Sequence, residues 1–364
     1  MKVGILGAGQ LARMIALAGY PLGLEFIFLD PSADACANPL GEHLHGDYND
    51  LALLAQLAER ADVVTYEFEN VPADVADFLS SHTQVHPSPK ALAVAQDRLV
   101  EKNFFNSIGI ATPAYAAVNS LDELQAAMAT IGYPAVLKSR TQGYDGKGQS
   151  VLRTAADLAA AWTVLDGVPA IVEAFVPFSR EVSVIAARNA AGEIVYYPLS
   201  ENRHRGGILR VSECTTDDRL QVSAQVYVTR LLEALNYVGI LALELFEVDG
   251  QLIANEFAPR VHNSGHWTIE GAQTSQFENH LRAITGLPLG STAAVNKAAM
   301  VNFIGGLPAS ADILSIPGVH LHLYGKEPRK GRKIAHATLR TETAENLAAI
   351  TAQLARLADQ TDDS

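Results

Sequence analysis

The feature that most constrains the fold is a hairpin signal in the second half of the chain. The dipeptide Asp-Gly at residues 249–250 separates two apolar runs at residues 241–246 and 252–257, a pattern typical of a tight β-turn between paired strands. Because side chains alternate between the faces of a strand, the loop length decides how Glu244 and Glu256 lie. A two-residue loop would place the two carboxylates on opposite faces. A three-residue loop with a glycine bulge would place them on the same face.

Two carboxylates side by side repel each other, and such pairs are commonly explained by a bound cation. The segment after the hairpin adds groups that suit an anion: Arg260, His262, Asn263 and Ser264. A divalent metal ion beside an anion pocket is typical of sites that catalyse phosphoryl transfer, so this stretch is the first candidate active site. The alternative is a surface hairpin with two solvated glutamates and a polar loop, and the hairpin alone does not distinguish the two.

Length, charge and hydropathy narrow the class of protein. A chain of 364 residues with 48% hydrophobic residues exceeds what one core usually serves, which predicts a globular enzyme of two or three domains. The formal net charge of -13 argues against nucleic acid or an anionic membrane as a partner. The chain enters its first predicted strand at once, and no apolar run reaches the roughly 20 residues of a membrane helix. We therefore expect a cytoplasmic protein without a signal peptide. Cys36 and Cys214 form no CxxC motif, so we expect structural thiols rather than a zinc site or disulfide.

The first 90 residues or so alternate between strand and helix signals. Strands are predicted at residues 3–6, 25–29 and 62–66, and helices at 10–18 and 51–59. This alternation predicts a doubly wound parallel sheet.

The first strand-to-helix turn reads Gly-Ala-Gly-Gln-Leu-Ala at residues 7–12, and Asp30 ends the second strand. This matches a dinucleotide-binding fingerprint in its Ala-ended form. A helix N-terminus binds any phosphate, however, including that of a phosphorylated substrate. The rest of the chain offers no specific hydride-transfer site, which favours the substrate-phosphate interpretation.

A glycine-rich segment at residues 143–148 joins a strand at 134–138, which ends on Lys138, to a strand at 149–153. A glycine-rich loop between two strands is typical of a flap over nucleotide phosphates, with backbone amides and lysines as donors. A surface hairpin is the alternative. Lysines seldom occupy strands without a partner, which favours the flap.

Further segments supply candidate nucleotide contacts. An apolar strand at residues 170–177 could place the backbone of Val176 at an adenine edge, with Glu173 at the exocyclic amine and Glu181 at the ribose. The alternative is a strand with two exposed acids, and the local sequence does not distinguish the two. Residues 91–105 predict a single helix, which carries Arg98 and Lys102. Taken alone, this helix is more simply explained as a solvated amphipathic face. Near the C-terminus, five basic residues in eight positions predict a phosphate site or a solvated turn: Lys326, Arg329, Lys330, Arg332 and Lys333.

In this order, these segments resemble the ATP-grasp ligases, and most closely the 5-(carboxyamino)imidazole ribonucleotide synthase family of purine biosynthesis. The resemblance covers essentially the whole chain, and residues 256–267 are its most specific part. It implies an α/β ATP-grasp architecture of three domains. These are an N-terminal doubly wound parallel-sheet, Rossmann-like domain (residues 1–98), a central lid domain with the glycine-rich flap (99–178), and a C-terminal α+β domain with the metal and substrate sites (179–364).

The resemblance also implies roles for particular residues. It implies an ATP site formed by Arg98, Lys138, Gly143, Tyr144, Asp145, Gly146, Lys147, Gly148, Glu173, Val176, Glu181, His204, Asn255 and Glu256. It implies Mg²⁺, or Mn²⁺ in its place, on Glu244 and Glu256. It implies that bicarbonate and the ribonucleotide contact Gln10, Leu11, Arg260, His262, Asn263, Ser264, Lys326, Arg332 and Lys333. Several relatives carry Asn where this chain has Ala258, so water would replace one metal contact.

The implied reaction is the ATP- and bicarbonate-dependent carboxylation of the exocyclic amine of 5-aminoimidazole ribonucleotide through carboxyphosphate, which gives ADP and phosphate. Arg260 and Lys138 would act on the transferring groups, and Asp145 or His262 would be the base. The resemblance also implies a homodimer. Three alternatives stay open: another ATP-grasp ligase, such as a formate-dependent glycinamide ribonucleotide transformylase, an NAD-dependent oxidoreductase, and a non-catalytic nucleotide sensor.

Overall fold

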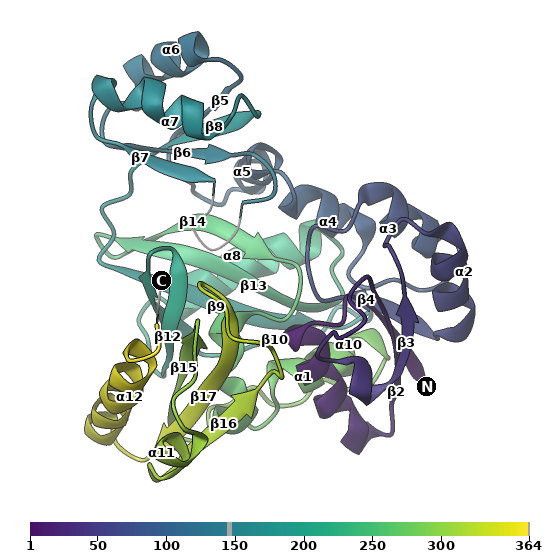
Figure 1. The fold of residues 1–364 in the computed structure, drawn as a ribbon. Helices are drawn as coiled ribbons and strands as arrows, with labels where there is room; N and C mark the ends of the chain where they lie inside the picture. Colours follow the sequence, from purple (N-terminus) through teal and green to yellow (C-terminus); the bar gives the residue numbers. More distant parts are fainter. Residues whose placement is uncertain (144–147, 363–364) are drawn as a thin grey trace.

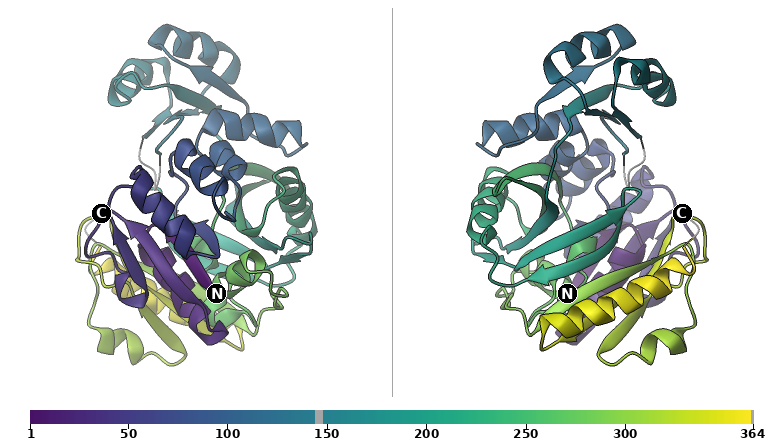
Figure 2. Two further views of the ribbon diagram at one scale, coloured as in Figure 1. Left: turned by 90° about the vertical axis from the view of Figure 1, so that its right-hand side faces the viewer. Right: turned by 90° about the vertical axis from the view of Figure 1, so that its left-hand side faces the viewer.

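The computed structural model describes residues 1–143 and 148–362, within which the strands form three sheets. Figure 1 shows the N-terminal sheet and the large C-terminal sheet side by side, with the central sheet standing above them. Two further views confirm that the central unit projects from the rest of the molecule (Figure 2). No helix in the described ranges has the length and apolar character needed to cross a membrane.

The N-terminal sheet is parallel, as predicted, with the strand order β3-β2-β1-β4. Its strands are β1 (Lys2–Leu6), β2 (Glu25–Asp30), β3 (Glu42–His45) and β4 (Val63–Tyr66), and its helices are α1 (Gln10–Gly19), α2 (Leu51–Arg60) and α3 (Ala73–Ser80). Alternate residues of β1 and β2 belong to two apolar clusters, one with α1 and the other with α2. Helices therefore cover both faces, which is the doubly wound arrangement.

The prediction of a single helix over residues 91–105 is wrong. The structure has two helices, α4 (Pro89–Ala95) and α5 (Arg98–Ser107). Asp97 between them has extended backbone angles, and its carboxylate accepts the amides of Leu99 and Val100 at 2.9 and 3.4 Å. An N-cap of this kind starts a new helix, so Arg98 lies at the first turn of α5 rather than in a helix interior.

The central sheet is antiparallel, with the order β5-β8-β6-β7. It comprises β5 (Tyr115–Val118), β6 (Ala135–Ser139), β7 (Gln149–Leu152) and β8 (Ala170–Ala174), with α6 (Leu121–Ile131), the short η3 (Ala155–Asp157) and α7 (Leu158–Val164). The two α-helices pack on one face, in a core that includes Leu137 and Val172. The opposite face carries Val136 and Lys138 toward the rest of the molecule.

The largest sheet has the order β14-β13-β9-β11-β12-β15-β17-β16, with β10 paired to β9, and all its pairs are antiparallel. Its strands are β9 (Arg180–Arg188), β10 (Ile194–Tyr196), β11 (Leu199–Arg205), β12 (Ile208–Thr215), β13 (Gly239–Val248), β14 (Gln251–Ala258), β15 (Lys297–Ile304), β16 (Val319–Leu323) and β17 (Lys333–Thr341). Its helices are α8 (Gln221–Ala234), α9 (Thr268–Gly271), α10 (Gln276–Ile284), α11 (Ser310–Leu314) and α12 (Ala344–Asp359). Helices α10 and α1 share one apolar cluster, which joins this sheet to the N-terminal sheet.

The turn between β13 and β14 is a two-residue loop. Val248 pairs with Gln251 across Asp249 and Gly250, whose φ angles of 49° and 76° suit a type I′ turn. By side-chain alternation alone, this loop would send Glu244 and Glu256 to opposite faces.

A β-bulge in β14 reverses that outcome. The register shifts by one residue, so that Glu244 lies opposite both Asn255 and Glu256. The paired residues that flank the bulge are buried in one apolar cluster on one face: Leu243, Leu245, Ala254 and Phe257. The other face is therefore shared by Glu244, Asn255 and Glu256, although the turn has only two residues.

Replacing Gly250 by Ala is expected to lower the free energy of unfolding by about 1–2 kcal/mol, because φ near +76° disfavours a Cβ atom. That Cβ would also lie 2.9 Å from Nη1 of Arg219. Asp249→Asn is the matched control, since Asn-Gly suits the same turn. Chemical denaturation followed by circular dichroism measures both variants, and equal stability of Gly250→Ala and the native protein would contradict the turn assignment.

Candidate active site

The three sheets line one cleft of about 650 Å³. The N-terminal sheet contributes α1 and the segment after β4, the central sheet contributes β6 and β7, and the large sheet contributes β9, β11, β13 and β14. The predicted site residues that line this cleft are Gln10, Leu11, Arg98, Lys138, Gly143, Glu181, His204, Glu244, Asn255, Glu256, Arg260, His262, Asn263 and Lys333.

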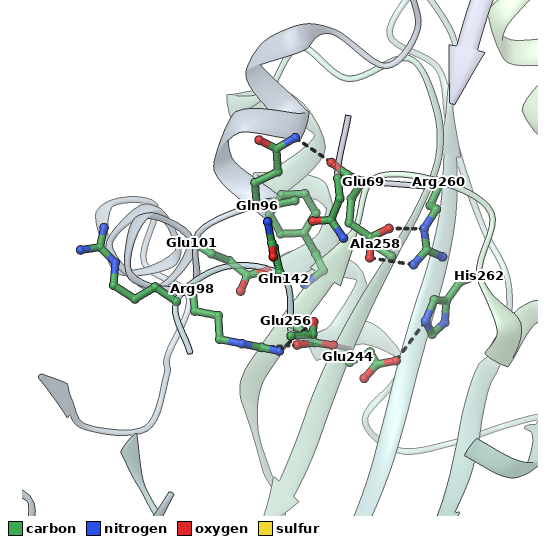
Figure 3. Close-up of a pocket in the computed structure, with 15 residues that line it drawn as sticks. Glu69, Gln96, Arg98, Glu101, Gln142, Glu244, Glu256, Ala258, Arg260 and His262 are labelled. Atoms are coloured by element: carbon green, nitrogen blue, oxygen red, sulfur yellow. Dashed lines mark hydrogen bonds and ion pairs between the residues drawn. The ribbon is translucent and has the colours of Figure 1, made fainter. Parts of the chain in front are cut away.

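Glu244 and Glu256 form the acidic centre of the cleft (Figure 3). Enclosure in the cleft and the neighbouring charge of Glu256 raise the pKa of Glu244 to about 7. Enclosure also acts to raise the pKa of Glu256, but the charge and hydrogen bond of Arg98 bring it down to about 2. Nη1 of Arg98 lies 2.5 Å from Oε2 of Glu256. The bulge thus brings together two acids that each need a nearby cation.

Arg260 faces this acidic pair from the loop after β14, and it is held by Glu69. Its Nε and Nη2 donate to the two oxygens of Glu69 at 2.5 and 3.1 Å, and its Nη1 donates to the carbonyl of Val261. This bidentate pair joins the large sheet to the N-terminal sheet (Figure 3). The guanidinium keeps the pKa of Glu69 low even though burial acts to raise it.

His262 is held between Glu244 and Ser264. Its Nε2 lies 3.2 Å from Oε1 of Glu244, and its Nδ1 lies 2.8 Å from the hydroxyl of Ser264. Ser264 is buried and accepts a further hydrogen bond from Ser183 at 2.6 Å. Burial, with the charges of Arg260 and Lys333, lowers the pKa of His262 to about 3, so its imidazole is neutral near pH 7 and a weak base.

The nucleotide side of the cleft is built on a lysine–glutamate pair of the central sheet. Nζ of Lys138 lies 3.0 Å from Oε2 of Glu173, and Nζ of Lys102 lies 3.4 Å from the same oxygen. The other oxygen of Glu173 is buried without a hydrogen-bond partner. Across the cleft, His204 on β11 pairs with Glu181 on β9.

The glycine turn after β1 is closed by acidic side chains. Glu67 accepts the amides of Gly9 and Ala12 at 2.5 and 3.0 Å, and Asp30 accepts the amide of Ala8 at 2.8 Å. The start of α1 therefore already holds a carboxylate where a dinucleotide would place its pyrophosphate. Beside it, Lys326 donates a hydrogen bond to Gln10, which brings the C-terminal basic segment to the N-terminal sheet.

Several predicted residues lie elsewhere. Glu173 lies beneath Lys138, and Ser264 is buried behind His262. The carbonyl of Gly148 accepts the amide of Ser139, and that of Val176 accepts the amide of Phe178. Arg332 donates to the carbonyl of Glu327 at 3.2 Å and does not line the cleft. Tyr144, Asp145, Gly146 and Lys147 lie outside the described residues.

The segment after β4 also lines the cleft, with Glu67, Phe68, Glu69 and Asn70, none of which is among the predicted site residues. The position of this segment directly after a predicted strand could have identified these residues. Polar side chains that follow a strand of a parallel sheet lie at the edge where ligands bind.

Family models match three parts of the chain. A ribonucleotide synthetase preATP-grasp domain matches residues 1–96, an ATP-grasp domain matches 103–277, and a phosphoribosylaminoimidazole carboxylase C-terminal domain matches 298–350.

Similar proteins extend the match over the whole chain. The chain is 55% identical to an N5-carboxyaminoimidazole ribonucleotide synthase of Pseudomonas aeruginosa, over 98% of this chain and 99% of that protein. The crystal structure of the synthetase from Thermus thermophilus superposes with a TM-score of 0.93 and 52% identity, with 98% of each chain covered. A synthase from Aspergillus clavatus in complex with ADP and 5-aminoimidazole ribonucleotide superposes with a TM-score of 0.92 and 30% identity, over 99% of this chain and 98% of that one. The chain therefore belongs to the N5-carboxyaminoimidazole ribonucleotide synthase family of ATP-dependent ATP-grasp ligases.

Proposed function

We propose that this cleft carboxylates the exocyclic amine of 5-aminoimidazole ribonucleotide with bicarbonate at the expense of ATP. The observation that carries the proposal is the bulge, which places Glu244 and Glu256 on one face between Lys138 on the nucleotide side and Arg260 on the other. The relatives named above act as synthases of the carboxylated ribonucleotide, and one of them binds both ADP and the acceptor.

ATP would lie between the central sheet and the edge of the large sheet. Lys138 and Arg98 supply positive charge for its phosphates. Glu181 lines the cleft and is placed for the ribose hydroxyls, and Glu173 and Val176 remain the predicted contacts of the adenine. We propose the same domain limits as above, at residues 98 and 178. We also propose that residues 143–148 act as a flap over the ATP phosphates.

The paired carboxylates suit a divalent cation. The high pKa of Glu244 reflects repulsion by Glu256 and its enclosure, and a cation would relieve both. No cluster of three His, Cys, Asp or Glu ligands occurs among the described residues. That agrees with Mg²⁺, which usually takes one or two carboxylates and completes its shell with water and phosphate oxygens. Bound there, Mg²⁺ or Mn²⁺ would neutralise the charge that develops on the phosphoryl group.

In the proposed reaction, a bicarbonate oxygen attacks the γ-phosphorus of ATP, and the bond to the leaving ADP oxygen breaks. The product is carboxyphosphate, which Arg260 orients through its guanidinium after exchanging Glu69 for the anion. The amine of the acceptor then attacks the carboxyl carbon, phosphate leaves, and the amine loses a proton. Asp145 and His262 are the candidate bases. His262 as placed here is better suited to orient Glu244 than to accept a proton, because its pKa is low.

The ribonucleotide phosphate would bind between the two ends of the chain. Gln10 and Leu11 line the cleft there with Lys333, and Lys326 contacts Gln10. Asn263 adds a side-chain amide whose two polar atoms are buried without partners, which suits a ligand contact. Arg332 is also predicted to contact this phosphate. The protein is predicted to form a homodimer.

The acceptor is tested by ADP release from MgATP and bicarbonate. We expect strong stimulation by 5-aminoimidazole ribonucleotide and none by glycinamide ribonucleotide with formate. Stimulation by the second pair alone would favour the formate-dependent ligase and overturn the proposal.

Replacing Glu256 by Gln is expected to lower kcat by about 10²- to 10³-fold, the size of losing one preorganised electrostatic group. Steady-state ADP release measures kcat, and circular dichroism reports the fold. Glu213→Gln, on β12 of the same sheet but outside the cleft, is the matched control. Near-native turnover of a folded Glu256→Gln protein would contradict the metal assignment.

Replacing Arg260 by Lys is expected to raise KM for bicarbonate and to lower kcat by about 10²-fold, because lysine cannot make the bidentate contact. Arg282→Lys is the control, since Arg282 pairs with Glu278 on α10 away from the cleft. Bicarbonate saturation curves for both variants give the comparison. Equal bicarbonate KM values for the two variants would remove Arg260 from the bicarbonate site.

A further inference from the structure

The β-bulge that aligns the acidic pair is held by two ionisable side chains of another element. Nζ of Lys102 donates to the carbonyl of Asn255 at 2.6 Å and approaches that of Ala254 at 3.4 Å. The amide of Phe257 donates to Oε1 of Glu101 at 2.8 Å. Because β14 is the edge strand of the large sheet, its backbone groups that point away from β13 need partners from outside the ladder, and the bulge changes which groups these are. Two consecutive residues of α5 supply them.

Both side chains are almost completely buried, with Glu101 2% and Lys102 1% exposed. Burying a charge is unfavourable unless the group is paired and hydrogen-bonded. Burial and the charge of Glu256 raise the pKa of Glu101 to about 8, and burial lowers that of Lys102. Neutral side chains could make the same hydrogen bonds with a smaller desolvation penalty. The burial of an ionisable pair here therefore indicates a role other than packing.

The same lysine also reaches the nucleotide side of the cleft. Its Nζ lies 3.4 Å from Oε2 of Glu173, the oxygen that Lys138 also contacts at 3.0 Å. Helix α5 therefore connects the bulge of the large sheet to the central sheet. Neither Glu101 nor Lys102 lines the large cleft, although Glu101 lines a smaller pocket that shares Glu244 and Glu256 with it (Figure 3).

We propose that Glu101 and Lys102 are positioning residues, which hold the bulge of β14 in the register that directs Asn255 and Glu256 into the cleft. They act through the backbone and contact neither substrate nor cation. Without them, β14 would lose the partners of its carbonyl at 255 and its amide at 257, and the bulge would be free to shift along the strand. This inference rests on the proposed cation role of Glu244 and Glu256.

The test measures cation binding directly. Mn²⁺ is titrated into the protein in the presence of ADP, and free Mn²⁺ is followed by electron paramagnetic resonance. Glu101→Met removes the acceptor of the Phe257 amide, and we expect Mn²⁺ affinity to fall by about 10- to 100-fold, as when outer-shell partners of a metal site are lost. Glu101→Gln keeps a side-chain oxygen at that place and should bind Mn²⁺ almost as the native protein does. Lys102→Met should resemble Glu101→Met.

Val228→Ala controls for a general loss of stability. Val228 is fully buried on α8 in the same apolar cluster as Phe257, but it does not line the cleft. If it weakens Mn²⁺ binding as much as Glu101→Met at a comparable thermal midpoint, or if Glu101→Met binds Mn²⁺ natively, the inference is wrong. Should Glu101→Met not fold, Glu101→Asp, which keeps the carboxyl group but shortens its reach, must show the same loss.

Hydrogen exchange separates this inference from the proposed function. Exchange of the Phe257 amide should accelerate in Glu101→Met and not in Glu101→Gln, whatever the cleft binds. If the native protein itself binds no Mn²⁺ with ADP, the cation role fails. If it binds Mn²⁺ and the Phe257 amide stays protected in Glu101→Met, the positioning role fails.

Discussion

The single extra residue in β14 sets the directions of the side chains on which the cleft depends. Alternation along the strand and the two-residue turn would together place Glu244 and Glu256 on opposite faces of the sheet. The bulge moves Glu256 to the cleft face while Phe257 stays in the apolar cluster behind the sheet. A local departure from regular pairing therefore creates the acidic pair, and buried charges from α5 surround the place where pairing is lost.

Charge pairing across sheets is the second constraint. Arg98 of α5 pairs with Glu256 of β14, and Arg260 of the large sheet pairs with Glu69 of the N-terminal sheet. Both arginines that would contact a substrate anion thus already have an acidic partner from a different part of the chain. Substrate binding must exchange these partners, which makes the site sensitive to how the three sheets are held together. The shared apolar cluster of α1 and α10 fixes two of those sheets against each other.

Local sequence patterns predicted much of the architecture. The strand and helix alternation of the first 66 residues predicted the parallel sheet. Lys138 on β6 was predicted to contact a nucleotide phosphate, and in the structure it pairs with Glu173. The helix predicted over residues 91–105 failed because an apolar period continues across Asp97, whose side chain caps a new helix instead. The pairing of Glu69 with Arg260 could not be predicted from local patterns, because the two residues lie 191 positions apart.

The sequence by itself determined which groups are present and the local elements that carry them: the Asp-Gly turn, the glycine turn before α1, and the polar segment after β14. Those features depend on neighbouring residues, whose steric preferences and hydrogen bonds act over a few positions. Only the tertiary structure decided that the glycine turn is closed by Glu67, that Lys326 meets Gln10, and that the two acids share a face. Each of these outcomes depends on contacts between distant segments, because a bulge or a buried ion pair is stable only when the rest of the fold supplies its partners.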